Sequence, residues 1–382
     1  MPIVENRAQQ LAQETLLIDT HIDVPYRLHI EWDDVSQATD GGNFDYPRAI
    51  AGGLNAGFMS IYTDPTLEAK GLSREVAEEL LDIVDRLVAD SPEKFALALS
   101  PADVEDQFRK GLISLPIGME NGSPIEGNLD NVQYFFERGV RYITLAHGLS
   151  NHIADSSYDD NRPWGGLSDF GVEVVHEMNR LGIMIDVSHL SDDASLDILN
   201  LTAAPIIASH SSVRHFTPGW ERNLSDELIR KIADNDGVVM VSFGSVFLTQ
   251  EARVYEDRRD VAYDKYLTEQ NIDGSDALED AFNLDYSASV EAYPYATMQD
   301  LLNHFDHIVE LVGVDHVGIG SDFDGVGDSL PFGLKGVDGY PNLIGGFIGR
   351  GYSDGEIEKM LGGNLIRVWR EVERYAATGA RN

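Results

Sequence analysis

The chain has 382 residues, of which 28 are basic and 65 acidic, and its formal net charge is −37. This excess of acid excludes nucleic acid and anionic membranes as natural partners. Hydrophobic residues make up 43% of the chain, which is typical of a globular protein. There is no cysteine, so disulfides and thiolate metal sites are excluded, and any metal must be held by nitrogen and oxygen ligands.

The N-terminal residues Met1–Arg7 lack the apolar core of a signal peptide. No stretch approaches the length of a membrane span. We therefore expect a soluble chain, with a cytoplasmic location favoured and a periplasmic or secreted location if a leader peptide has been removed.

Short apolar runs rich in Ile, Val and Leu alternate with helical patterns along the chain. Such runs, bounded by Gly or Pro, are typical of strands buried on both faces of a parallel sheet. We predict eight of them, with Phe95–Ser100 as an extra short strand. In chain order the eight are Leu16–Asp23, Gly57–Tyr62, Leu112–Glu120, Arg141–His147, Ile183–His189, Pro205–His210, Gly237–Phe243 and His316–Asp322.

Helical segments separate the predicted strands. Four of these helices are expected to begin with a serine cap, at Ser73, Ser168, Ser225 and Ser353. Near the C-terminus, Gly362-Gly363-Asn364 is predicted to break a helix, with Asn364 capping the last one, Leu365–Tyr375.

Eight strands with intervening helices predict an α/β protein, a (β/α)8 TIM barrel formed by a single domain over residues 1–382. A doubly wound sheet is the alternative. The barrel is favoured because polar residues end so many strands: an open sheet collects ligands at one switch point, whereas a barrel gathers every strand end around one axis. Residues 245–297 interrupt the rhythm after the seventh strand and are predicted to be an insertion, either a lid, an oligomer contact or a solvated excursion.

Five side chains suited to binding metal stand where predicted strands end. His21 and Asp23 alternate onto one face of the first strand, while Glu120, His189 and His210 end the third, fifth and sixth. Each alone is more often structural, but together they predict a site in which a carboxylate bridges two cations and activated water becomes the nucleophile. Imidazole and carboxylate ligands favour two Zn²⁺ ions, with Mn²⁺, Co²⁺ or Fe²⁺ as alternatives.

Other polar residues near the strand ends are candidates for substrate chemistry. Asp322, beside two glycines on its face of the eighth strand, could move a proton to a leaving amine, and Asp324 is its rival for that role. Arg222, beyond the sixth strand, could bind a substrate carboxylate. His147, after the fourth strand, could hydrogen-bond a carbonyl or a tetrahedral oxyanion.

Taken together, these segments resemble the membrane (renal) dipeptidase family of zinc metallopeptidases, within the amidohydrolase superfamily. The resemblance spans nearly the whole chain in family order. The matching segments are 18–23 (IDTHID), 117–120 (IGME), 141–147 (RYITLAH), 185–189 (IDVSH), 209–212 (SHSS), 222–223 (RN), 320–325 (GSDFDG) and 363–368 (GNLIRV).

The resemblance implies a division of the metal ligands and a reaction. His21 and Asp23 would bind one zinc, His189 and His210 the other, and Glu120 would bridge them. The implied reaction is hydrolysis of a dipeptide by a hydroxide held between the metals. Family members often accept a D-residue at the C-terminal position, and some open β-lactam rings.

The resemblance also implies roles around the substrate. His147 would contact the peptide carbonyl, Arg222 would hold the C-terminal carboxylate with Asn223 beside it, and Asp322 would be the proton shuttle. A homodimer is a further expectation from the family. Two alternatives stay open: a related metallohydrolase acting on N-acyl amino acids, lactones, β-lactams or phosphoesters, and a non-catalytic binding protein that has kept the scaffold.

Overall fold

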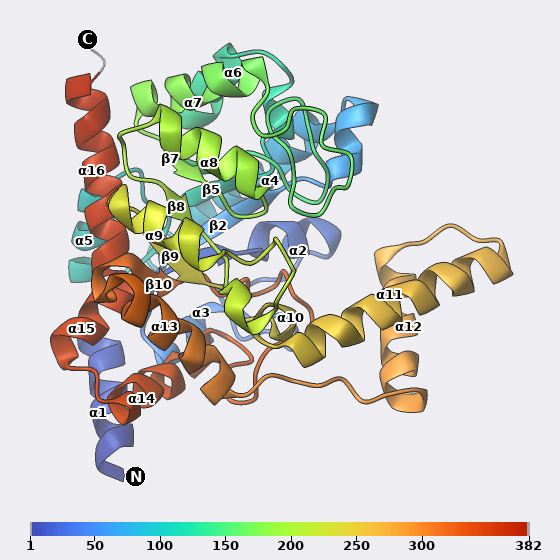
Figure 1. Ribbon diagram of the computed structural model, residues 1–382. Coiled ribbons are helices and arrows are strands. Elements are labelled where there is room, and N and C mark those ends of the chain that lie inside the picture. The colour runs from blue at the N-terminus through green and yellow to red at the C-terminus, as the bar shows by residue number, and fades with distance from the viewer. Residues whose placement is uncertain (1, 380–382) are drawn as a thin grey trace.

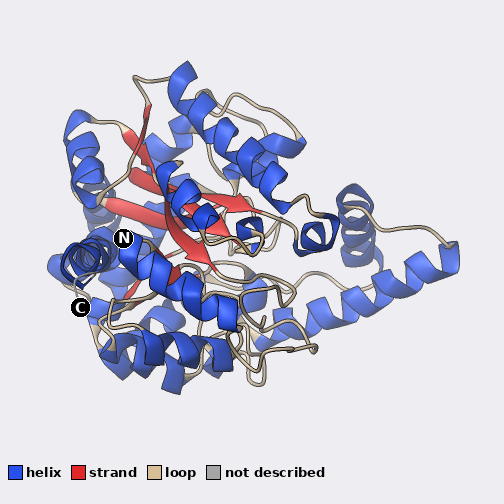
Figure 2. Cartoon of the chain, turned by 90° about the horizontal axis from the view of Figure 1, so that it is seen from above, coloured by secondary structure: helices blue, strands red, loops and turns tan. Residues whose placement is uncertain are grey.

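A parallel β-sheet lies at the centre of the molecule with helices around it (Figure 2). The computed structural model describes residues 2–379. Its strands are β1 (Leu17–Ile22), β2 (Leu54–Tyr62), β3 (Phe95–Leu97), β4 (Ile113–Leu115), β5 (Ile117–Glu120), β6 (Val140–Thr144), β7 (Met184–Asp186), β8 (Ile207–Ala208), β9 (Val238–Val241) and β10 (Val317–Ile319). Their order in the sheet is β10-β9-β8-β7-β6-β5-β2-β4-β3, and β1 pairs with β2.

The first and last strands of the sheet meet at their C-terminal ends. The Asp322 amide donates to the His21 carbonyl at 3.1 Å, and the Asp23 amide donates to the Phe323 carbonyl at 2.8 Å. Every ladder between neighbouring strands is parallel. The α/β class is therefore confirmed, and the arrangement is consistent with the predicted TIM barrel.

Each predicted strand segment overlaps a strand, but most strands end earlier than predicted, and β2 and β6 begin before the predicted segments. The third prediction, Leu112–Glu120, is two strands rather than one, because Pro116 has no N–H to give to a ladder and separates β4 from β5. His189 and His210 lie in the loops that follow β7 and β8. Strand alternation therefore did not place them, although the loops bring them to the same end of the sheet.

Sixteen α-helices are assigned within residues 2–379, and none is both long and apolar enough to cross a membrane. They are α1 (Pro2–Glu14), α2 (Val24–Ile30), α3 (Tyr46–Gly52), α4 (Ser73–Asp90), α5 (Pro101–Lys110), α6 (Asp130–Glu137), α7 (Asp169–Leu181), α8 (Asp192–Leu201), α9 (Asp226–Asp234), α10 (Ser245–Leu248), α11 (Gln250–Gln270), α12 (Asp276–Ser289), α13 (Met298–Val312), α14 (Tyr340–Arg350), α15 (Asp354–Glu358) and α16 (Asn364–Gly379).

Helix capping agrees with the sequence at three of the four predicted serines. Ser168, Ser225 and Ser353 each accept a backbone N–H from the first turn of α7, α9 and α15. Ser73 does not cap α4, because it lies inside the first turn and Leu72 occupies the cap position.

The predicted break at Gly362-Gly363-Asn364 is wrong. A π-helical turn, Lys359–Gly363, joins α15 to α16 without interruption. A Cβ on Gly362 would lie 2.7 Å from the Leu16 carbonyl oxygen, so this glycine permits close approach to the segment entering β1 rather than ending a helix. The Asn364 side chain donates to the carbonyls of Val314 and Val317 instead of capping.

The segment 245–297 is largely helical. Helices α11 and α12 form an arm that extends away from the rest of the molecule (Figure 1). The two helices pack through aromatic rings: the ring centroid of Phe282 in α12 lies 5.2 Å from that of Tyr263 and 5.4 Å from that of Tyr266, both in α11. At the base of the arm, the Ala296 amide donates to the Ser245 hydroxyl at 2.9 Å.

Candidate metal centre

The side chains predicted to bind metal meet where the strands of the sheet end. Ligand atoms of His21, Glu120 and His210 lie within 4.8 Å of one another. The same holds for two further groups. One consists of Glu120, His147 and His189, and the other of His21, Asp23 and Asp322. Because the groups share His21 and Glu120, they form one buried cluster.

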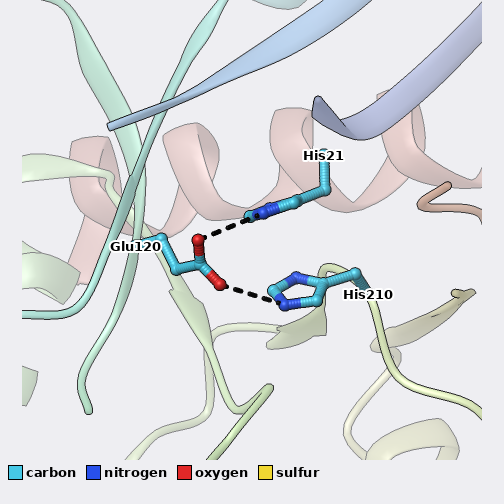
Figure 3. A group of neighbouring side chains, drawn as sticks. All are labelled: His21, Glu120 and His210. Atoms are coloured by element: carbon cyan, nitrogen blue, oxygen red, sulfur yellow. Dashed lines mark ion pairs between the residues drawn. The ribbon is translucent and has the colours of Figure 1, made fainter. Parts of the chain in front are cut away.

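Glu120 presents its two carboxylate oxygens to different imidazoles (Figure 3). Oε2 lies 3.3 Å from His21 Nε2, whereas Oε1 lies 3.1 Å from His189 Nε2 and 3.3 Å from His210 Nε2. Burial would raise the pKa of Glu120, but the His21 and His147 rings hold it well below its ordinary value. An ionised carboxylate therefore stands between two sets of nitrogen donors.

Several buried nitrogen and oxygen atoms of the cluster have no hydrogen-bond partner among the residues described. They are Nε2 of His21, both carboxylate oxygens of Asp23 and Nδ1 of His189. Leaving such atoms unsatisfied costs about 1–3 kcal/mol each, so their concentration in one place calls for a ligand. A metal ion that accepts lone pairs meets this need.

The protonation preferences of the imidazoles also suit a cation. Burial lowers the pKa of His189 and His210 well below the ordinary value, which keeps their rings neutral. Burial would lower the pKa of His21 too, but Tyr142, Asp23 and Glu120 raise it well above its ordinary value. Positive charge is therefore favoured at Nε2 of His21. The buried His and Glu groups fit a metal site.

Hydrogen bonds behind the cluster set the tautomers of two rings. The Tyr142 hydroxyl donates to the Thr20 carbonyl at 3.0 Å, so it accepts from Nδ1 of His21 at 2.7 Å. The Ser209 hydroxyl likewise donates to Asp186 at 2.6 Å and accepts from Nδ1 of His210 at 2.7 Å. In the neutral form of each ring, Nε2 is then the nitrogen without a proton and it points at Glu120, as is usual for histidines that bind metal.

Backbone strain coincides with the cluster. His189 has φ +68° and Asp322 has φ +66°, in the left-handed region that costs a residue with a side chain about 1 kcal/mol or more. Asp186 helps to hold this geometry, because its carboxylate accepts from the backbone amides of Ser188 (3.0 Å) and Ser209 (2.7 Å). Strain held by surrounding contacts is typical of functional sites.

Asp322 and Asp324, the two rivals, have different surroundings. Asp324 accepts from the Asn43 amide at 2.5 Å and from Arg27 at 3.1 Å, so both of its oxygens are engaged. Within residues 2–379 the Asp322 carboxylate accepts one side-chain hydrogen bond, a long one of 3.4 Å from the Ser242 hydroxyl. Burial, with Asp23 and Glu120 nearby, raises the pKa of Asp322 to about 7. A carboxyl with that pKa can exchange a proton near neutral pH.

Arg222 is a buried cation without an acidic partner. It is 1% exposed, and its guanidinium donates to the Ser211 hydroxyl at 2.9 Å and to the His210 carbonyl at 2.8 Å. Its Nε has no partner, and no carboxylate within residues 2–379 forms an ion pair with it. A buried charge that lacks a counter-charge is costly, and an anionic ligand would relieve that cost.

Asn223 is fully engaged within the protein. Its Nδ2 donates to the Thr217 hydroxyl at 2.7 Å and to the Phe247 carbonyl at 2.8 Å, and its Oδ1 accepts from the Ser212 amide at 3.2 Å. The predicted contact between Asn223 and substrate stays a prediction, and these hydrogen bonds favour an indirect role.

A cavity of about 450 Å³ opens onto the cluster. Much of its wall is formed by the aromatic side chains of Tyr26, Tyr62, Tyr158 and Phe247, and His147 and Val326 also line it. Nδ1 of His147 is buried without a partner, and its ring lies 4.1 Å from that of His189. The cavity is large enough for a small peptide beside the metal cluster.

Sequence reasoning missed the residues that support the ligands. Tyr142 lies in an apolar strand and looks like a core residue. Asp186 had a signal that could have found it, since an acidic residue beside a run of buried strand residues needs several hydrogen bonds. The aromatic wall had no signal, because its members come from elements that are distant in the sequence: α2, β2, α10 and the loop after β6.

Imidazoles and carboxylates buried at the C-terminal ends of parallel strands define a metal-dependent hydrolase. The family model for membrane dipeptidase (peptidase family M19) matches residues 5–381. The chain therefore belongs to this family and is a metallo-dipeptidase, which confirms the resemblance predicted from sequence.

Solved structures of similar proteins share the fold. The probable dipeptidase PvdM from Pseudomonas aeruginosa is 28% identical with a TM-score of 0.82, over 98% of this chain and 99% of that one. Dipeptidase AC is 24% identical with a TM-score of 0.77, over 94% and 98%. A metallo peptidase from Rhodobacter sphaeroides, liganded with a phosphinate mimic of the dipeptide L-Ala-D-Ala, is 24% identical with a TM-score of 0.76, over 94% and 100%.

Proposed function

We propose that this chain is a binuclear zinc dipeptidase that hydrolyses dipeptides with a free C-terminal carboxylate. The observation that carries the proposal is the position of Glu120, whose two oxygens face separate groups of imidazoles. His21 and Asp23 would hold one ion, His189 and His210 the other, and Glu120 would contact both. Zn²⁺ suits these ligands best, with Mn²⁺, Co²⁺ or Fe²⁺ as alternatives. A pair of such ions activates water and polarises the scissile carbonyl.

Arg222 would bind the C-terminal carboxylate of the dipeptide. Its burial, its unpartnered Nε and its lack of an acidic partner support this role, since a substrate carboxylate would complete its interactions. Asn223 would act as a positioning residue, because its amide joins the loop after Arg222 to the carbonyl of Phe247.

His147 and Asp322 would act on the peptide bond. The neutral His147 ring faces the cavity beside Glu120, where it can donate a hydrogen bond to the substrate carbonyl as negative charge develops on oxygen. Asp322, with few competing hydrogen bonds, would take a proton from the attacking water and deliver it to the nitrogen of the leaving amine.

We further propose that the site tolerates a D-residue at the C-terminal position. The ligand of the similar metallo peptidase, a mimic of L-Ala-D-Ala, supports this extension. Residues 1–382 would form a single barrel domain, with 245–297 as an insertion after the seventh strand.

A substrate panel tests the proposal. Zinc-loaded protein is assayed with L-Ala-L-Ala, L-Ala-D-Ala and D-Ala-D-Ala, together with the C-terminal amide and the N-acetyl form of L-Ala-L-Ala. We expect L-L and L-D dipeptides to be hydrolysed and the amide to be at least about tenfold poorer, because a charged contact to Arg222 is lost. Equal hydrolysis of the acid and its amide would contradict the carboxylate site.

Substitution of Asp322 tests the proton-transfer step. The Asp322→Asn variant should keep its metal ions and lose about 10²–10⁴-fold in kcat, the usual size of a general acid–base contribution. Near-normal hydrolysis by that variant would remove Asp322 from the mechanism. The neighbouring Asp324 would then have to be tested for the same role.

A further inference from the structure

The guanidinium of Arg222 has an aromatic neighbour that the proposed reaction does not use. Its Cζ lies 4.9 Å from the ring centroid of Phe247, a residue of α10 that lines the cavity and is 6% exposed. A cation this close to an aromatic ring is attracted by the negative charge on the ring face. Phe247 therefore attracts the Arg222 guanidinium, and it does so from the wall of the cavity.

Phe247 in turn stacks on Trp220, which precedes Arg222 by two residues. The two rings are almost parallel, with an interplanar angle of 10° and centroids 5.4 Å apart. Such offset stacking fixes the relative position of two rings. The hydrogen bond of 2.8 Å from Asn223 to the Phe247 carbonyl ties the same two segments together through the backbone.

A further partner of Trp220, besides Phe247 and Tyr158, comes from the arm. Cζ of Arg253 lies 4.6 Å from the Trp220 ring centroid. Arg253 is in the first turn of α11, where the arm leaves α10 (Figure 1). An unbroken series of four side chains, Arg253, Trp220, Phe247 and Arg222, therefore runs from the base of the arm to the buried cation.

This series suits a role in positioning. Within residues 2–379 the Arg222 guanidinium donates to neutral partners, among them Nε2 of His189 at 3.2 Å, and no ion pair fixes it. The stacked rings limit where its guanidinium can lie, and Phe247 forms part of the cavity wall that the C-terminal residue of a bound dipeptide would face. A side chain held in advance loses less entropy when it binds its ligand.

We propose that the series Arg253–Trp220–Phe247–Arg222, with Arg253 as a positioning residue supplied by the α11–α12 arm, sets the affinity of the site for the substrate carboxylate. The arm would thus contribute to substrate specificity from outside the cavity. This inference rests on the proposed function in one respect, namely that Arg222 receives the carboxylate.

The test compares full-length, zinc-loaded variants on L-Ala-L-Ala and on its C-terminal amide. Arg253→Gln removes the outer cation from Trp220, and Arg253→Lys keeps a cation there. Arg258→Gln is the matched control, because Arg258 is a cation of the same helix that pairs with Glu291 at 3.0 Å, as Arg253 pairs with Asp257. Zinc content is measured for every variant, so that loss of metal is separated from loss of substrate affinity.

We expect Arg253→Gln to raise KM for the dipeptide about 3- to 10-fold, the range of a half-buried cation–aromatic contact, with kcat within about twofold. KM for the amide should change little, Arg253→Lys should restore most of the loss, and Arg258→Gln should match the wild type. Trp220→Phe offers a second measurement, with a smaller rise in KM, because phenylalanine binds cations more weakly than tryptophan.

The outcomes separate this inference from the function beneath it. If the wild type uses the dipeptide and its amide equally well, the carboxylate site itself is wrong, and the positioning role falls with it. If the wild type prefers the dipeptide to its amide and Arg253→Gln shows the same ratio of KM values for the two substrates, only the positioning role is overturned. An equal rise in KM for both substrates would also overturn it, since that result indicates general disturbance of the cavity.

Discussion

Replacing Tyr142 with phenylalanine would remove one hydroxyl from behind His21, a proposed metal ligand. Tyr142 is fully buried, and its hydroxyl accepts from Nδ1 of His21 at 2.7 Å while donating to the Thr20 carbonyl at 3.0 Å. In Tyr142→Phe, Nδ1 of His21 loses this partner inside the protein. The ring is then free to rotate or to place its proton on the other nitrogen, the one that faces Glu120.

The expected loss follows from that geometry. Removing one partner of a buried donor costs about 1–3 kcal/mol, and hydrogen bonds to the distal nitrogen of a ligating histidine are worth about 10- to 100-fold in metal affinity. We therefore expect the first zinc lost on chelator titration of Tyr142→Phe to bind about 10- to 100-fold more weakly than in the wild type.

Chelator competition measures that affinity directly, and a surface variant controls for general effects of removing a hydroxyl. Tyr375→Phe in α16 serves this purpose, because it leaves the metal cluster untouched. Zinc affinity in Tyr142→Phe equal to that of both the wild type and Tyr375→Phe would refute the claim that Tyr142 fixes the His21 tautomer.

Three other changes test the support of the site and the stability of the fold. Gly118→Ala would place a Cβ 2.0 Å from Cζ of Tyr142, so zinc affinity should fall at least as far as in Tyr142→Phe, and unchanged chelator titration would contradict the close approach. Asp186→Asn would lose charged hydrogen bonds worth about 1.5–3 kcal/mol each, so both Tm and zinc content should fall. A Tm equal to that of the wild type would contradict the supporting role of the Asp186 carboxylate. Burial lowers the pKa of His304 from 6.5 to about 4. The neutral side chain therefore makes its full contribution to the free energy of unfolding above pH 6.5. As the pH falls from 6.5 toward 4, this contribution is lost by about 1.4 kcal/mol per pH unit. Urea unfolding at pH 7 and pH 5 should therefore show a larger loss for the wild type than for His304→Gln, by roughly 2 kcal/mol, whereas equal losses would be inconsistent with a buried neutral His304.

Sequence reasoning reached the metal cluster because its signal is local and repeated. Each ligand follows a buried apolar run, and parallel strands bring their C-terminal ends together whatever the intervening chain does. Errors in the predicted strand boundaries do not move His189 and His210 away from the cluster: both lie past the strands that were expected to end with them, yet both reach Glu120.

The features that sequence reasoning missed depend on packing between distant segments. Gly362 looks like a helix breaker, but its role is to let the chain approach Leu16, and a π-helical turn absorbs the two glycines. The stacking of Trp220 on Phe247 and the contact with Arg253 join three separate segments. No periodicity in the chain encodes such contacts, because they are set by how the loops fold over the ends of the strands.

Anomalous diffraction from crystals of the zinc-loaded protein, collected on both sides of the zinc edge, tests the central claim most directly. The account predicts two zinc peaks, one beside His21 and Asp23 and one beside His189 and His210, with the carboxylate of Glu120 between them. A single peak, or peaks away from Glu120, would contradict a binuclear centre in which this residue is the shared ligand.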